Sequence, residues 1–142
     1  MGRNLRFWLT APQAAPFDPG DAPLALGALL LRAARTEHAP LFALPGMLDT
    51  VLARRYDLTP AEASEMLEAC ARVEAAAPDN AQFAALLHSV ICHADRCAMA
   101  VSLADTLRAA GSCAPGDPRP LALAETFLGV TPAEIALPRR AG

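Results

Sequence analysis

The chain has 142 residues, of which 54 % are hydrophobic and 19 % are charged, and its formal net charge is −3 at pH 7. This length and composition predict one folded domain and exclude a disordered chain. The small negative charge and the absence of a basic run exclude a typical nucleic-acid partner. The longest strongly apolar run, LALGALLL over 24–31, is about a third of a membrane span, and the chain shows no secretory signal. We therefore expect a soluble, cytoplasmic protein without a transmembrane segment, in which the cysteines are reduced.

Taken in chain order, residues 1–20 are expected to form an N-terminal segment with an extended, Pro-rich connection, and residues 21–142 a single domain. Leu5, Phe7, Trp8 and Leu9 are expected to fold over the domain and cover a groove, the alternative being a membrane or partner surface. After this segment, apolar residues recur with helical periodicity and no strand pattern is found. The helices are predicted at 21–37, 45–56, 59–76, 80–92, 95–110 and 118–128, with a short helix ending at 138.

The ends of several predicted helices carry recognisable capping residues. Asp21 and Asn80 stand where an N-cap is expected, and Gly111 and Gly129 stand where a helix should stop in a left-handed turn. The run 24–31 is apolar all round, which indicates a helix buried at the centre of the domain.

One capping motif occurs twice, as LTPAE over 58–62 and as VTPAE over 130–134. In each copy the Thr can accept a hydrogen bond from the amide of the Glu three residues later, and that Glu can reach back to the Thr amide. Pro suits the first helical position in both copies. Because each copy follows a helix–loop–helix pattern, we interpret the pair as a degenerate internal duplication, with chance repetition as the alternative.

An ordered set of segments carries a family resemblance: LLLRAARTEH, RYDLTPAEA, EAAAPDNAQFAALLHSV, DRCAMAVSLADTLRAAG and FLGVTPAEI. In this order and spacing, from about residue 22 to residue 138, the chain resembles the tellurite-resistance TerB family. The resemblance implies an all-α fold: a compact bundle of about seven helices built from two pseudo-symmetric helix-loop-helix repeats. It also implies a non-catalytic module that binds a protein partner in a stress-related or tellurite-related context.

Typical relatives carry an Ala-Asp-Gly junction and an acidic loop in each repeat, which the resemblance implies as a divalent-cation site. Here the two junctions read THE at 36–38 and AAG at 109–111. Glu37 and Asp117 are the acids left near the family's positions. A Ca²⁺ ion requires six to eight oxygen ligands, so this pair is a remnant and no cofactor is expected.

The decapeptide HSVICHADRC, residues 88–97, raises the question of a soft-metal site, because His88, Cys92, His93 and Cys97 are all zinc-ligand types. In one continuous helix the two His/Cys pairs would lie about 140° apart and could not share one ion. A break near Cys92 would bring them closer. The alternative is structural, with the cysteines packed as small apolar residues and His93 or Asp95 capping the next helix. Metal binding through this cluster is the second functional hypothesis.

The loop residues Leu41 and Phe42 are apolar where the family is charged, which favours either a closed core or a protein contact surface. Cys113 lies in a loop and is the thiol expected to be most exposed. We find no catalytic constellation and expect no enzymatic activity. The sequence leaves the oligomeric state open, with a homodimer as one arrangement.

Overall fold

The computed structural model describes Leu5 and residues 8–14, 16–77 and 79–135. Regular structure within these ranges is helical, with no strand, as the sequence predicts. None of the described helices combines the length and the apolar character needed to cross a membrane. The elements are η1 (Pro12–Ala14), η2 (Pro19–Asp21), α2 (Ala22–Ala33), η3 (Ala39–Phe42), α3 (Met47–Tyr56), α4 (Pro60–Ala76), α5 (Asn80–Val90), α6 (His93–Ala109), α7 (Arg119–Leu123) and η4 (Ala124–Leu128).

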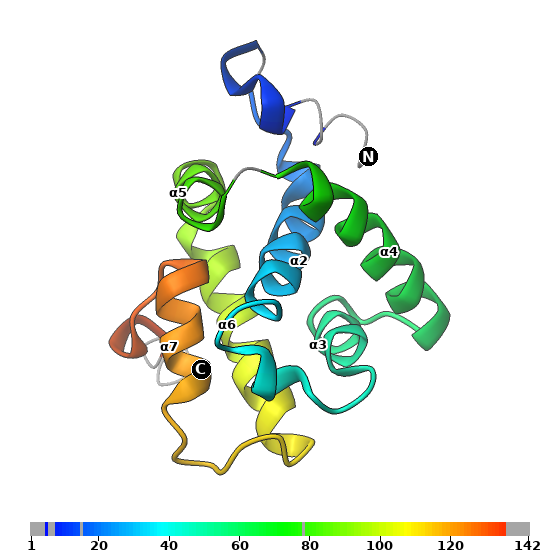
Figure 1. Ribbon diagram of the computed structural model, residues 1–142, viewed down its shortest axis with the longest axis vertical. Coiled ribbons are helices and arrows are strands. Elements are labelled where there is room, and N and C mark those ends of the chain that lie inside the picture. Colours follow the sequence, from blue (N-terminus) through cyan, green and yellow to red (C-terminus); the bar gives the residue numbers. More distant parts are fainter. Residues whose placement is uncertain (1–4, 6–7, 15, 78, 136–142) are drawn as a thin grey trace.

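Helix α2 lies in the middle of the molecule, with α3 and α4 on one side and α5, α6 and α7 on the other (Figure 1). All of its residues from Leu24 to Leu30 are buried, which confirms the central position predicted from the apolar run. Burial of each leucine contributes roughly 1.5–3 kcal/mol to folding. The helix ends at Ala33, earlier than predicted, because the chain turns through 34–38 toward Pro40.

Two contacts join α2 to α4. Gly27 faces Cys70 so closely that a Cβ atom at Gly27 would overlap the Cys70 sulfur, so a glycine is required for this approach. Near the end of α2, the carboxylate of Glu74 is 2 % exposed and meets Arg32 Nε at 3.3 Å and Arg35 Nη1 at 2.8 Å. Two guanidinium partners compensate the cost of removing this carboxylate from water.

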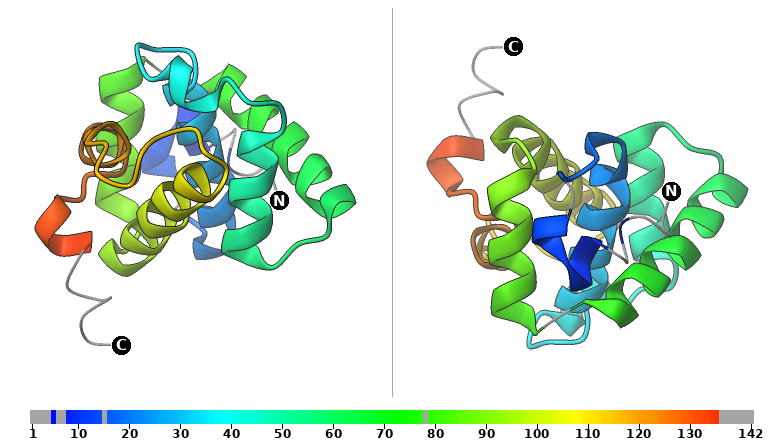
Figure 2. Two further views of the ribbon diagram at one scale, coloured as in Figure 1. Left: turned by 90° about the horizontal axis from the view of Figure 1, so that it is seen from below. Right: turned by 90° about the horizontal axis from the view of Figure 1, so that it is seen from above.

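Both capping boxes predicted from the sequence are present. The Thr59 hydroxyl accepts from the Glu62 amide at 3.1 Å, and the Glu62 carboxylate accepts from the Thr59 amide at 2.9 Å. The equivalent distances for Thr131 and Glu134 are 3.2 Å and 2.8 Å. The second box starts the short turn 132–135, which lies at the edge of the bundle (Figure 2).

Two other predicted caps differ from the structure. Asp79, and not Asn80, caps α5, because its carboxylate accepts from the Gln82 amide at 3.0 Å. Asp21 is the N-cap residue of α2, but its backbone is already helical at the end of η2, and its side chain makes no capping bond. Burial raises the pKa of the Asp21 carboxyl, and the neighbouring Asp18 adds to this shift.

The N-terminal segment packs on the bundle as predicted. Leu5, Trp8 and Leu9 are at most 6 % exposed and belong to the main core. Trp8 meets Phe17 edge to face, with ring centroids 4.9 Å apart, and the segment lies across one end of the bundle (Figure 2). Phe7 lies outside the described residues. The connection that follows differs from the extended form predicted, because η1 and η2 are 3-10 turns.

Candidate functional site

The decapeptide 88–97 forms the corner between α5 and α6. Ile91 and Cys92 are extended and separate the two helices, so the predicted break is present. His88 remains on α5, and His93 and Cys97 lie on α6. The corner is therefore a junction of two helices whose side chains can point toward a third element.

That third element is the end of η4. His88 Nε2 lies 2.8 Å from the carbonyl oxygen of Phe127, and Arg96 Nη1 donates to the carbonyls of Leu128 at 3.0 Å and Gly129 at 3.1 Å. A carbonyl only accepts hydrogen bonds, so Nε2 of His88 carries the proton. The last carbonyls of a helix have no partner within the helix, and a cationic side chain at that end is favourable. We call this set of bonds from His88 and Arg96 to 127–129 the corner latch.

The turn held by the latch requires glycine. Gly129 has a φ of 65°, in the left-handed region. A Cβ at this position would lie 2.7 Å from Nδ1 of His88 and 3.0 Å from Nη1 of Arg96. The two side chains that bind the carbonyls therefore also occupy the space beside the Gly129 α-carbon.

The other half of the decapeptide contacts the second capping box. His93 Nε2 lies 2.5 Å from the Glu134 carboxylate, and the Cys97 sulfur lies 3.5 Å from Nε2 and 3.7 Å from Nδ1 of the same ring. These nearly equal distances mean that the sulfur is aligned with neither nitrogen. Burial raises the pKa of the Cys97 thiol, with a further contribution from Glu134. A neutral thiol is a poor nucleophile and a poor metal ligand, and the nitrogen nearest to it already faces a carboxylate.

The four side chains predicted as metal ligands therefore do not converge on one point. His88 binds the Phe127 carbonyl, Cys92 is exposed at the start of α6, and His93 contacts Cys97 and Glu134. Within the described part of the chain, no group of three or more His, Cys, Asp or Glu side chains could hold a metal ion. The predicted cap of α6 by His93 or Asp95 is also wrong, because Cys92 is the N-cap and makes no side-chain bond.

The two remnant acids have different environments. Asp117 forms a two-pronged ion pair with Arg119, at 2.7 Å to Nη2 and 3.0 Å to Nε, and the hydrogen bonds from Arg119 lower the pKa of the carboxyl. Glu37 is exposed in the turn after α2 and pairs with no described residue. Asp117 is thus occupied, and Glu37 is available to a partner.

The predicted contact residues lie in different places from those expected. Leu41 is 1 % exposed and belongs to the core, because η3 turns it inward, so its assignment to a contact surface is corrected. Phe42 is half-buried against the same core. Leu44, at 43 %, is the exposed large apolar side chain of this loop. Cys113 is also buried, and Cys92 is the exposed thiol instead.

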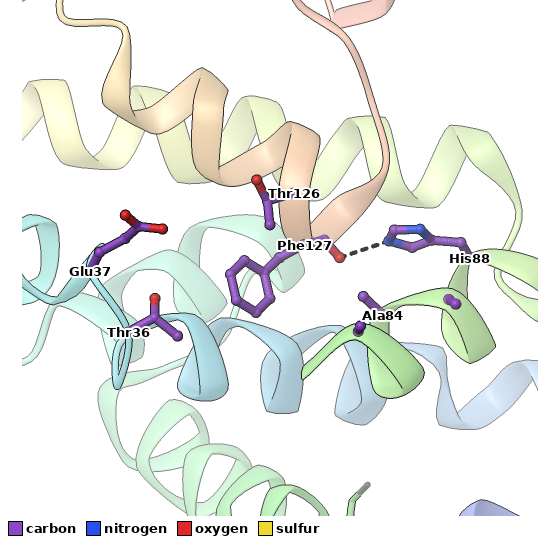
Figure 3. A pocket seen from close by; sticks show the side chains of 8 residues that line it. Thr36, Glu37, Ala84, His88, Thr126 and Phe127 are labelled. Atoms are coloured by element: carbon purple, nitrogen blue, oxygen red, sulfur yellow. Dashed lines mark hydrogen bonds between the residues drawn. The ribbon is translucent and has the colours of Figure 1, made fainter. Parts of the chain in front are cut away.

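A pocket of about 490 Å³ opens beside Phe127 (Figure 3). It lies between the turn after α2, the outer face of α5 and the end of η4. Most of its surface is apolar. The lining residues are Thr36, Glu37, Ala81, Ala84, Ala85, His88, Thr126 and Phe127.

The two ionisable groups of the pocket are placed at its two ends. Glu37 stands at one end and His88 at the other, with the Phe127 ring between them (Figure 3). The His88 Nε2 proton is engaged by the Phe127 carbonyl. Glu37 is therefore the charged group that the pocket offers to a ligand.

Sequence reasoning missed this pocket. The small residues Ala81, Ala84 and Ala85 follow i, i+3, i+4 spacing, which is a weak sign of a helix face that leaves room for a neighbour. The pocket exists because Phe127 comes from a segment 39 residues beyond His88 and is held there by the corner latch.

Comparisons with protein-family models, with curated proteins and with solved structures found no match to this chain.

Proposed function

We propose that the chain is a non-catalytic, TerB-like helical module that acts by binding another protein, in a stress-related or tellurite-related context. The pocket beside Phe127 is the site at which the partner inserts a side chain. The ordered segments that resemble the TerB family support the first part of this proposal. The geometry of the pocket supports the second.

The internal duplication is part of the proposal, and the turn geometry supports it. Asp57 and Gly129 both have left-handed backbones, with φ of 55° and 65°. Each stands two residues before the Thr of a capping box. In both places a left-handed residue is followed by an apolar residue and then by a capping box, at the same spacing. A duplicated helix–turn–helix unit would retain this order.

The pocket is the observation that carries the binding function. Its volume lies within the range of about 300–1,000 Å³ that is typical of ligand pockets, and apolar walls with a few polar groups are the usual composition. The walls stand on helices and on the latched end of η4, so the pocket is preformed and a partner does not have to order it.

The test begins with selection of peptides that bind the wild-type protein, for example by phage display. The affinity of each peptide is then measured by fluorescence anisotropy for the wild type and for three variants. Ala85→Trp and Thr126→Trp fill the pocket from two different elements, and both sites are exposed, so the fold should tolerate them. Ala71→Trp, on the exposed face of α4, is the matched control.

The proposal predicts that both pocket variants weaken binding at least about tenfold, which corresponds to 1.4 kcal/mol, and that Ala71→Trp leaves it unchanged. If the selected peptides bind both pocket variants as tightly as the wild type, the protein binds them through another surface. Failure of every selection would remove the support for a peptide-binding module.

Metal binding is the second candidate, and the contact of His93 with Cys97 beside Glu134 is the observation that favours it. A bound ion at about 100 times its Kd would add roughly 2.7 kcal/mol to stability and raise Tm by several degrees. Because the predicted ligands do not converge on one point, we expect no rise when Zn²⁺ is added to the reduced protein. A rise that disappears in Cys97→Ser would establish metal binding instead.

A further inference from the structure

We infer that the side chain accepted by the pocket is long and basic, a lysine or arginine of the partner protein whose cation meets Glu37. This inference rests on the proposed function and specifies its ligand. It follows from the distribution of charge in and around the pocket.

Among the pocket-lining residues, Glu37 is the only permanently charged side chain, and no Arg lies among them. Glu37 forms no ion pair with a described residue, so its carboxylate has no cation within the part of the chain that the structure describes. An anionic ligand would meet Glu37 without compensation, whereas a cationic ligand would supply the missing partner.

The arginines that stand near this region are already engaged. Arg32 and Arg35 both bind the buried Glu74 carboxylate, and Arg96 binds the carbonyls of the corner latch. Moving Arg32 or Arg35 to Glu37 would take one of its two guanidinium partners from the buried Glu74 carboxylate, and moving Arg96 would leave the end of η4 without its cation. The pocket therefore keeps its negative charge for a ligand from outside.

The rest of the pocket suits the stem of such a side chain. Lysine and arginine carry three or four methylene groups that pack on apolar surface while the charged end reaches a polar group. The walls offered by Ala81, Ala84, Ala85 and the Phe127 ring are of this apolar kind, and Glu37 lies at one end of them (Figure 3).

Three matched probes test this inference: Nα-acetyl-lysine methylamide, its norleucine analogue and its 2-aminoadipate analogue. They share a linear stem and end in an ammonium, a methyl and a carboxylate. Binding is followed through the amide shifts of the pocket residues by NMR, for the wild type, Glu37→Gln and the control Glu68→Gln. Glu68 is exposed on α4 and does not line the pocket.

We expect the lysine probe to bind roughly two- to fivefold more tightly than the norleucine probe, as for a partly exposed ion pair, and the aminoadipate probe to bind most weakly. The preference should vanish in Glu37→Gln and persist in Glu68→Gln. Equal binding of all three probes in the pocket would overturn the inference and leave the proposed apolar pocket intact. No shift of pocket amides with the lysine probe would also overturn it, while the selected peptides test the proposed function separately.

Discussion

At the scale of single residues, Gly129 and Gly111 provide a matched pair. Both have left-handed backbones, with φ of 65° and 78°. A Cβ at Gly129 would crowd His88 and Arg96, whereas a Cβ at Gly111 would meet no atom within 4 Å. The two glycines therefore share a conformational requirement and differ in packing.

Substitution by alanine separates these two effects. Gly111→Ala should lower the free energy of unfolding by about 1 kcal/mol, the cost of a left-handed non-glycine residue. Gly129→Ala should cost roughly 3 kcal/mol or more, because crowding of the corner latch adds to it. Urea denaturation measures both values. Equal losses would mean that the latch gives way to the new methyl group without cost.

Thiol reactivity is a second property of single residues. Cys92 is exposed, whereas Cys70, Cys97 and Cys113 are buried, and burial raises the pKa of Cys70 to about 12. We expect one of the four thiols to react rapidly with Ellman's reagent at pH 8, and this fast phase to be lost in Cys92→Ser. A fast phase that survives in Cys92→Ser and disappears in Cys113→Ser would place the exposed thiol in the loop, as the sequence alone indicated.

The residues of the decapeptide show what local sequence can and cannot specify. The spacing of His93 and Cys97, i and i+4, is enough to predict that they lie side by side on a helix. The partner of His88 is a carbonyl 39 residues away, and the latch carbonyls bound by Arg96 are 32 and 33 residues away. Every carbonyl looks the same in a sequence, so these contacts could not be predicted.

At the scale of secondary-structure elements, the two capping boxes link stability to pH. Hydrogen bonds from the Thr131 backbone and hydroxyl lower the pKa of Glu134 below its ordinary 4.5, and His93 adds to this. A carboxyl group whose pKa is lower in the folded state than in the unfolded state stabilises the fold. This contribution is fully present above pH 4.5 and is lost as the pH falls through the lowered pKa.

The urea midpoint of the wild type should therefore decrease more between pH 5 and pH 3 than that of Glu134→Gln, which keeps a hydrogen-bonding side chain that does not titrate. The same comparison with Glu62→Gln tests the first box, where bonds from Thr59 lower the pKa of Glu62. Parallel pH profiles of wild type and variant would show that the box contributes no pH-dependent stability.

The contact between α2 and α4 depends on the absence of one methyl group. Gly27→Ala should destabilise the protein by roughly 1–3 kcal/mol, because the added Cβ overlaps the Cys70 sulfur. In a Cys70→Ala background the same substitution should cost less, and a double-mutant cycle measures the coupling. Gly116→Ala, where a Cβ meets open space, is the control and should change little. Additive effects of the two substitutions would contradict direct contact.

At the scale of the whole molecule, the all-helical class, the central position of the apolar run and both capping boxes follow from periodicity and short-range hydrogen bonding. The pocket does not, because its walls come from the turn after α2, from α5 and from η4. Leu41 illustrates the same limit. An apolar loop residue fits a surface or a core equally well in the sequence, and only the direction of η3 places it inside.

The most direct test of binding through the pocket is an NMR titration of the wild-type protein with a selected peptide. We predict that the largest amide shift changes fall on the pocket residues, among them Thr36, Ala84, His88 and Phe127. The largest changes around Leu44, in the exposed loop between η3 and α3, would contradict the account and transfer the interaction to that loop.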